Sequence, residues 1–344
     1  MTIMSSARAT RDTPTLRTHL MKMHDSVIKK SLHSLAEFAE VGACYSLALA
    51  RLEALAAALQ EDHLITSTWH FLEPRLHHDP GKGTVVAGGR QGEGPEDLNY
   101  PQRVACEADG ALIVADPENG RVCRWRNGLG EPLGNFSRAA VDDSPSYAVC
   151  VDCDGSILAT TFDGLARWDW RIGEDRLCRE AAAANLADHC GLCANSEGVV
   201  VADHLNGRVV RFPKRGGCEE LLPEGTICQG RRVETPADVT FGPGGSLLIA
   251  DRTGGRVLRR DPSGSLSVLA ENLAWPYTLA RCGDLLYVGQ FKTMNVVRID
   301  LSTGAKEDWR PIRGPTGICF DADCNLYITE KLMHRVMHFP ASFD

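Results

Sequence analysis

The sequence predicts an all-β fold, a six-bladed β-propeller that carries an N-terminal α-helical extension. Three observations support this prediction. A unit of short apolar runs recurs six times, Asp-Gly and Asn-Gly turns separate the runs, and the last copy lacks one strand that an upstream segment can supply. The chain has 344 residues, of which 33 are Gly, and this suits a large turn-rich β domain plus an extension.

The first copy of the repeat starts at Pro101 and shows the unit in full. An apolar run leads into an Asp-Gly turn, a second run ends in Val-Ala-Asp at Asp116, and an Asn-Gly turn leads into a third run at Arg121. Short runs rich in Val and Ile that are cut by such turns are typical of antiparallel strands. The later copies start at Pro145, His189, Pro236, Pro276 and Pro315. Their spacing of roughly 40 to 47 residues is that of one four-stranded propeller blade.

The last copy indicates how the ring closes. It contains only three runs, and residues 341–344 are too few for a fourth. The segment 84–87 (TVVA) stands before the first copy without a partner of its own. We expect this segment to form the outermost strand of the last blade, because the pairing closes the ring and leaves no unpaired strand edge.

These repeats resemble the NHL-repeat family of six-bladed β-propellers. The resemblance rests on the P-x-x-V start, the D-G turn, the V-A-D strand end and the N-G-R-V turn. The copy from Pro145 lacks the full N-G-R-V turn, and the copy from Pro276 lacks the Asp after its second strand. Members of this family have different functions, so the resemblance implies the fold and not one activity.

The chain divides into a disordered tail (1–25), a helical extension (26–62), a linker (63–83) and the propeller (84–344). Apolar residues at steps of three and four, and the Ala-rich run LARLEALAAAL, indicate helix in the extension. We favour packing of this helix on the propeller and keep open a homodimer that it would mediate. The linker holds His70, His77 and His78, which we expect to be solvated.

Bulk properties indicate a cytoplasmic protein. No stretch reaches the roughly 18 to 20 uninterrupted apolar residues of a membrane span, and residues 1–24 lack the apolar core of a signal peptide. The basic residues of that segment are compatible with an organelle transit sequence, but we prefer a disordered tail. The 13 cysteines are therefore expected to be free thiols in a reducing compartment.

Two C-x-x-C pairs, Cys150-Cys153 and Cys190-Cys193, have the spacing of zinc ligands. Counted along their blades at about 3.3 Å per residue, Cys153 and Cys190 fall on the order of 20 Å apart. Four thiolates that are placed in this way cannot bind one ion. We therefore predict no metal site and no cofactor.

Other polar patterns also favour structural roles. Cys150 and Cys193 lie level with each other, as do Cys106 and Cys319 in other blades, which indicates small side chains in an inner layer. The D-x-D patterns at 152–154 and 321–323 fall in turns between strands, where Asp is common, and lack the full ligand set of a calcium loop.

The sequence shows no catalytic constellation, and we predict no catalytic residues. Some six-bladed lactonases use an Asn directly after the blade-start Pro, and amidating lyases use converging His ligands. Here the residues after the blade starts are Gln102, Ser146, Cys190, Ala237, Tyr277 and Thr316. A metal-assisted hydrolase or lyase that uses the central cavity stays open as the alternative from another functional class.

We predict that the loop face binds a protein or another polar partner, as a binding or scaffold module. The loop face is the side where each first strand begins and where the second strand turns into the third. Its candidate binding residues are Tyr100, Gln102, Tyr147, His189, Arg252, Tyr277, Lys292, Arg313 and Lys331. RNA binding on this face is a further alternative, which the net charge of −8 disfavours. Ligases of the family carry a Cys/His-rich zinc module before the propeller, but only Cys44 precedes it here.

Overall fold

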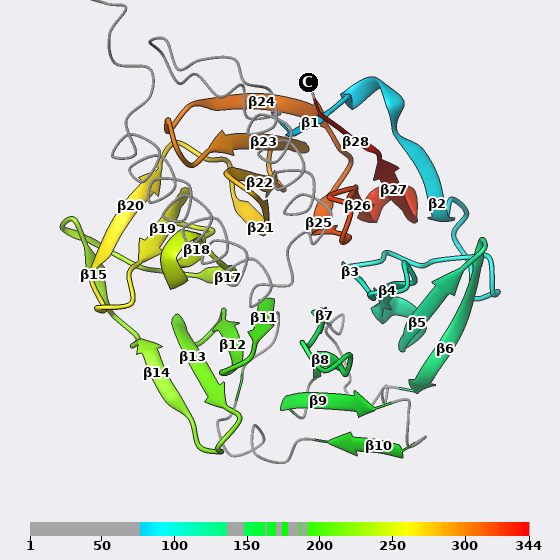
Figure 1. Ribbon diagram of the computed structural model, residues 1–344, viewed down its shortest axis with the longest axis horizontal. Coiled ribbons are helices and arrows are strands. Elements are labelled where there is room, and N and C mark those ends of the chain that lie inside the picture. The colour runs from blue at the N-terminus through cyan, green and yellow to red at the C-terminus, as the bar shows by residue number, and fades with distance from the viewer. Residues whose placement is uncertain are drawn as a thin grey trace, which may run out of the picture.

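The computed structural model describes residues 76–135, 148–161, 164–169, 174–177, 186 and 191–343. They form six four-stranded antiparallel sheets, which are arranged as blades around a common centre (Figure 1). This architecture confirms the predicted all-β six-bladed propeller. The predicted tail, the helical extension and the dimer contact it would make lie outside the described residues. No helix within those residues is long and apolar enough to span a membrane.

Each blade runs from an inner strand at the centre to an outer strand at the rim (Figure 1). Blade 1 consists of β3 (Arg103–Cys106), β4 (Leu112–Asp116), β5 (Arg121–Arg126) and β6 (Leu129–Asn135). Blade 2 consists of β7 (Val149–Val151), β8 (Ile157–Thr161), β9 (Gly164–Asp169) and β10 (Glu174–Leu177). Blade 3 consists of β11 (Gly191–Asn195), β12 (Gly198–Asp203), β13 (Arg208–Pro213) and β14 (Glu219–Leu222).

The second half of the ring repeats this order. Blade 4 consists of β17 (Pro236–Phe241), β18 (Leu247–Asp251), β19 (Arg256–Arg260) and β20 (Leu266–Ala270). Blade 5 consists of β21 (Pro276–Cys282), β22 (Leu285–Gln290), β23 (Asn295–Asp300) and β24 (Lys306–Pro311). Blade 6 consists of β25 (Pro315–Phe320), β26 (Leu326–Glu330), β27 (Arg335–Phe339) and the upstream strand β2 (Thr84–Gly88). A short hairpin of β15 (Ile227–Cys228) and β16 (Arg231–Arg232) lies between blades 3 and 4.

The ring closes as predicted. Strand β2 pairs antiparallel with β27, and Thr84 lies opposite His338. The structure adds a second pairing that the sequence analysis did not foresee. Strand β1 (Leu76–His78), inside the predicted linker, pairs with β28 (Ala341–Phe343). Two consecutive strands from the N-terminal side are therefore paired with the last two strands of the described chain.

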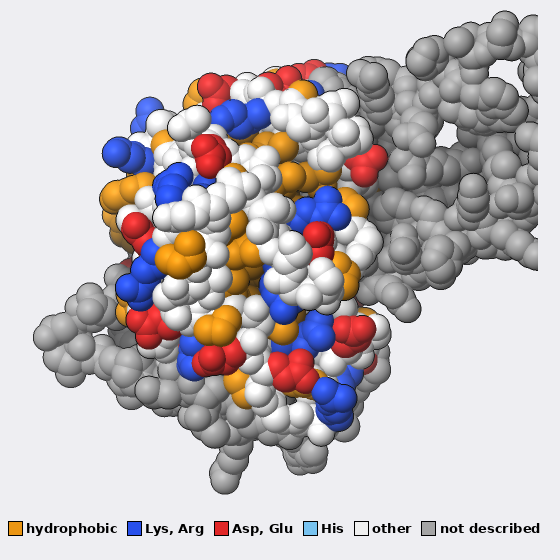
Figure 2. All heavy atoms as spheres, turned by 90° about the vertical axis from the view of Figure 1, so that its left-hand side faces the viewer, with side chains coloured by type: hydrophobic (Ala, Val, Ile, Leu, Met, Phe, Trp, Pro, Cys, Tyr) orange, Lys and Arg blue, Asp and Glu red, His pale blue; other side chains and the backbone are white. Residues whose placement is uncertain are grey.

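Apolar side chains that lie between neighbouring blades form the core. Successive residues of a strand point to opposite faces of its sheet. In β18, Ile249 packs in a cluster with blade 3, whereas its neighbour Leu248 packs in a cluster with blade 5, and both are fully buried. Burial of each such side chain contributes about 1.5–3 kcal/mol. The outer edge around β15 and β20, in contrast, carries interspersed acidic and basic side chains (Figure 2).

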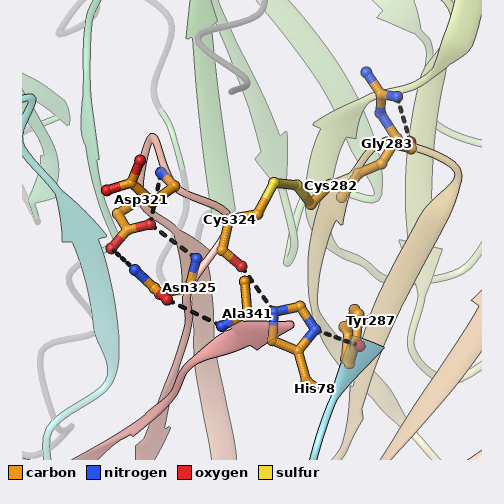
Figure 3. The surroundings of a disulfide bond; sticks show 10 residues. His78, Cys282, Gly283, Tyr287, Asp321, Cys324, Asn325 and Ala341 are labelled. Atoms are coloured by element: carbon orange, nitrogen blue, oxygen red, sulfur yellow. Dashed lines mark hydrogen bonds between the residues drawn. A yellow bond between two sulfur atoms is a disulfide. The ribbon is translucent and has the colours of Figure 1, made fainter. Parts of the chain in front are cut away.

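The prediction that the linker histidines are solvated is wrong for His78, which is fully buried. Its Nε2 donates to the Cys324 carbonyl at 2.7 Å, so its Nδ1 accepts from the Tyr287 hydroxyl at 2.9 Å (Figure 3). The Trp309 indole donates to the His78 carbonyl at 3.1 Å. These contacts fix β1 against blades 5 and 6.

The prediction that all cysteines are free thiols is also wrong at one place. Cys282, at the end of β21, and Cys324, in the turn before β26, form a disulfide between blades 5 and 6 (Figure 3). Eight cysteines of the described residues are free.

Candidate functional site

An acidic residue and an Arg, repeated in four of the six blades, anchor the turns of the loop face. The Asp at the end of the second strand accepts a hydrogen bond from the Arg that starts the third strand. In blade 4, Arg256 Nε donates to Asp251 at 2.9 Å, and both side chains are almost completely buried. Arg256 also donates to carbonyls of the β15–β16 hairpin, and Asp251 accepts from the backbone of Thr235. Blades 1, 3 and 6 hold the equivalent pairs Asp116–Arg121, Asp203–Arg208 and Glu330–Arg335.

Blade 5 fills the same place with a neutral pair. Gln290 Nε2 donates to Asn295 Oδ1 at 3.0 Å, and Gln290 Oε1 accepts from the backbone of Ala274 at 2.5 Å. The missing Asp of this copy is thus replaced by an amide that still anchors the preceding loop.

The loops of blades 4 and 5 enclose the segment around Trp275. Leu273 N donates to Gly255 O, and Phe291 N donates to Trp275 O at 3.1 Å. Trp275 itself has a positive φ of 56° and leaves 42% of its surface exposed. The Arg252 guanidinium lies 4.9 Å from the centre of its ring, and the Lys292 ammonium lies 5.8 Å from it. We call Arg252, Trp275, Tyr277 and Lys292 the Trp275 cluster.

Tyr277 joins this cluster to the centre of the ring. Its ring centre lies 5.5 Å from the Arg252 guanidinium and 5.8 Å from the Phe291 ring. The Tyr277 hydroxyl donates to the Gln102 side chain of blade 1 at 3.4 Å.

A chain of backbone contacts continues the surface to blade 6 and blade 1. Ile312 N donates to Met294 O at 2.9 Å, and Leu332 N donates to Arg313 O at 3.2 Å. His334 then accepts from the backbone of Tyr100 at 3.1 Å, and their rings lie 4.5 Å apart. The loops of blades 4, 5, 6 and 1 therefore present one continuous surface.

Arg103 closes the centre of the ring on this side. It extends from blade 1 to the opposite blades, where Nη1 donates to Asp238 at 2.5 Å and to Thr278 at 2.8 Å. All three residues are buried. Behind them lies a cavity of about 250 Å³, lined by the inner strands of all six blades. The negative charge of Asp238 is thus paired with the positive charge of Arg103. The described residues hold no group of three His, Cys, Asp or Glu side chains that could bind a metal ion.

Comparison with known proteins places the chain. No protein-family model matches it. The human E3 ubiquitin-protein ligase TRIM32 is 25% identical over 174 residues, which are 45% of this chain and 25% of the ligase, and mouse TRIM32 matches to the same extent. The chain thus spans about a quarter of the length of the curated relatives it matches. Together with the repeat motifs and the six blades, this match supports the predicted NHL-like fold. The chain is an NHL-like β-propeller.

Solved structures support the propeller fold alone. A protein of unknown function from Bacteroides thetaiotaomicron has a TM-score of 0.62 at 11% identity, covering 78% of this chain and 77% of its own. A streptogramin B lyase has a TM-score of 0.53 at 12% identity, covering 78% of this chain and 98% of its own.

In this NHL-like propeller, the predicted binding residues divide into three groups. Arg252, Tyr277 and Lys292 lie together in the Trp275 cluster, with Gln102 buried beneath Tyr277. Tyr100, Arg313 and Lys331 lie further round the loop face, and their side chains do not join that cluster. Tyr147 and His189 lie outside the described residues.

Trp275, the centre of the cluster, is absent from the binding residues predicted from the sequence. Its signal was available, because a Trp directly before a blade-start Pro falls on the loop face. Phe291, between Gln290 and Lys292, carried the same signal.

Burial lowers the pKa of two groups on this face of the propeller. It lowers the pKa of Lys331, which the nearby Glu118 partly offsets. It also lowers the pKa of His334, so the neutral ring that accepts from Tyr100 is favoured.

The two C-x-x-C pairs do not form one site among the described residues. Cys150 and Cys193 line the central cavity, whereas Cys153 is exposed in a turn and accepts from Lys214 at 3.1 Å. Cys190 lies outside the described residues. The D-x-D carboxylates cap their own turns, as predicted: Asp154 accepts from Ser156 N, and Asp321 accepts from Asn325 N.

Proposed function

We propose that the loop face of this NHL-like propeller binds an acidic segment of a protein partner, and that the chain acts as a binding or scaffold module. One observation carries the proposal: the exposed Trp275 ring has two cations near it, the Arg252 guanidinium at 4.9 Å and the Lys292 ammonium at 5.8 Å from the ring centre. Trp, Tyr and Arg are the residue types that dominate binding energy at protein interfaces.

Backbone hydrogen bonds keep the Trp275 segment in place before a partner arrives. Hydrogen bonds from the loops of blades 4 and 5 fix its segment on both sides. A loop that is already ordered loses little conformational entropy on binding, which favours affinity.

Exposed apolar side chains gather on the same face. The exposed large hydrophobic residues of the described chain number six, and four of them lie in loop-face segments: Leu205, Ile227, Trp275 and Leu332. Among the described residues, this face therefore exposes more large apolar side chains than the rest of the propeller surface.

The charges around the Trp275 cluster indicate what the partner carries. Arg252, Lys292 and Arg313 are basic and at least partly exposed, and Lys331 adds a fourth cation on blade 6. This part of the face therefore attracts acidic side chains although the whole chain is acidic. The match to a protein named a ubiquitin-protein ligase supports a protein partner.

Fluorescence polarisation with labelled short peptides tests this proposal on the full chain. We expect Glu/Asp-rich peptides that contain an aromatic residue to bind, and basic peptides of equal length not to bind. Trp275→Ala should weaken binding by about 2 kcal/mol, which is roughly a 30-fold rise in Kd.

The matched control is Leu129→Ala, because Leu129 is 51% exposed and lies at the turn between β5 and β6, on the side away from the loop face. This variant should bind like the unmodified chain. Equal binding by Trp275→Ala, or tighter binding of an RNA oligonucleotide than of any acidic peptide, would contradict the proposal.

A further inference from the structure

Two free thiols face each other at the junction of blades 1 and 6. Cys106, on β3, and Cys319, on β25, have their sulfur atoms 3.4 Å apart. Both line the central cavity, and both are partly accessible to solvent. The Trp275 cluster and the Arg103 contacts use neither of them, so the proposed function leaves this pair without a role.

The backbone around this pair explains why the sulfurs meet. Gly317 of β25 lies so close to β3 that a Cβ atom there would come within 2.7 Å of the Arg103 Cα. Cys319 follows two residues further along β25, beside the neighbouring inner strand. The approach of the sulfurs is a property of two closely packed strands and does not depend on a loop.

The junction of blades 6 and 1 is also the place where the ring closes. Strands β25, β26 and β27 come from the end of the chain, and they are held to the upstream strand β2 by backbone hydrogen bonds. The Cys282–Cys324 disulfide joins blade 6 to blade 5, on its other side. A bond between Cys106 and Cys319 would therefore tie the inner strand of the last blade covalently to the first blade.

We propose that Cys106 and Cys319 are a site of reversible oxidation, at which hydrogen peroxide converts the two thiols into a disulfide between blades 1 and 6. One sulfur attacks a peroxide oxygen as the thiolate, the O–O bond breaks, and the sulfur becomes a sulfenic acid while one water leaves. The other sulfur then attacks the sulfenic sulfur, the S–O bond breaks, and a second water leaves. Two thiols and one peroxide thus yield one disulfide and two waters, and the peroxide takes up both electrons.

Distance and access both suit this reaction. An S–S bond is about 2.0 Å long, so the two sulfurs must approach by about 1.4 Å. Rotation about a Cα–Cβ bond moves a sulfur without moving its strand. Hydrogen peroxide is uncharged and scarcely larger than water, and the cavity of about 250 Å³ admits it, because one water occupies only about 30 Å³.

The same cavity contains a second pair of thiols for comparison. Cys150, on β7, and Cys193, on β11, line it from neighbouring blades and are also free. Among the free cysteines of the described residues, only Cys106 and Cys319 have their sulfurs in contact. Burial raises the pKa of Cys150 and of Cys193, and the hydrogen bond to Cys319 together with burial raises that of Cys106. Since all three thiols are slow to form the reactive thiolate, proximity decides which pair is oxidised.

Peptide mapping tests the proposal on the full chain. The chain is treated with hydrogen peroxide, blocked with N-ethylmaleimide and digested with trypsin without reduction. Tryptic peptide 314–331 contains both Cys319 and Cys324, and the existing disulfide links it to peptide 282–292. We expect peroxide to add peptide 104–121, which contains Cys106, and dithiothreitol to release it.

Matched variants identify the partner. In Cys319→Ser, peptide 104–121 should be recovered unlinked, whereas Cys150→Ser should form the link like the unmodified chain. Peroxide should also raise the urea midpoint of the unmodified chain but not that of Cys106→Ser, because a link across 213 residues restricts the unfolded chain.

Three results would overturn the proposal. They are the absence of linked peptide 104–121 from the peroxide-treated unmodified chain, its linkage to a cysteine other than Cys319, and a link between Cys150 and Cys193 that forms first. The mapping of the unmodified chain decides alone if a variant does not fold.

Discussion

Blades 4 and 5 build the same turn with different buried chemistry and present the same outer chemistry. Beneath its loop, blade 4 buries the ion pair Asp251–Arg256, whereas blade 5 uses the amides of Gln290 and Asn295. Above these pairs, each loop places one cation against Trp275. The buried pair anchors the loop whether it is charged or neutral. Recognition of a partner therefore depends on the residues above it, Arg252, Trp275 and Lys292.

The largest expected effect comes from breaking the charged pair. Arg256→Met leaves the Asp251 carboxylate buried without its cation, and removal of one partner from a buried pair costs about 3–5 kcal/mol. Urea unfolding measures this loss. Exchanging both residues for those of blade 5, as Asp251→Gln with Arg256→Asn, should cost clearly less. If the double variant is as unstable as the single one, the anchoring pairs of blades 4 and 5 are not interchangeable.

Breaking the neutral pair should have a smaller effect. Gln290→Leu removes the acceptor of the partly buried Ala274 amide, and the loss should be about 1 kcal/mol, the low end of the cost of an unsatisfied buried donor. Differential scanning calorimetry of this variant beside Arg256→Met ranks the two. A greater loss for Gln290→Leu would show that charge is not what makes the blade 4 anchor sensitive.

The outer cations should affect binding more than folding. Lys292→Ala removes one exposed cation from the Trp275 cluster, and an exposed charge pair with an acidic peptide is worth about 0.2–1 kcal/mol, so acidic peptides should bind up to a few-fold more weakly. The melting temperature should hardly change. A clearly lower melting temperature would show that Lys292 contributes to folding stability instead.

Blade 6 adds a titratable group to the comparison, with the smallest expected effect. Burial holds the pKa of His334 below its ordinary value, so folding favours the neutral ring. The stability this provides is fully present above the unfolded pKa of about 6.5 and is lost as the pH falls from that value through the lower folded-state pKa. His334→Asn tolerates the left-handed backbone there, and its stability should vary less between about pH 7.5 and pH 5. An unchanged pH dependence would exclude His334 as the source.

The sequence predicts much of this fold because the repeat motifs specify local structure, namely the strands and the turns between them. Turn residues and strand lengths gave the six blades, and a count of strands gave the pairing of β2 with β27. The burial of His78 could not be read in the same way, because its partners Tyr287 and Cys324 lie more than 200 residues further along the chain. The Cys282–Cys324 disulfide joins two blades whose relative positions no local motif describes.

The candidate site was predictable in part for the same reason. The blade topology predicted that Arg252, Tyr277 and Lys292 lie on the loop face, and the structure places them in one cluster. The role of Arg103 was not visible, because its partner Asp238 comes from the opposite side of the ring. Contacts across the centre depend on the rotation of each blade, which sequence periodicity does not specify.

The pairing of β2 with β27 has a consequence for biosynthesis. Residues 84–88 leave the ribosome early, while their partner residues 335–339 emerge only after five further blades. At roughly 5–20 residues per second, β2 remains without its partner for tens of seconds or less. During translation the strand is an open edge that other chains can pair with. Closure of the ring is then a late step, and molecular chaperones that shield strand edges would act on the nascent chain in this interval.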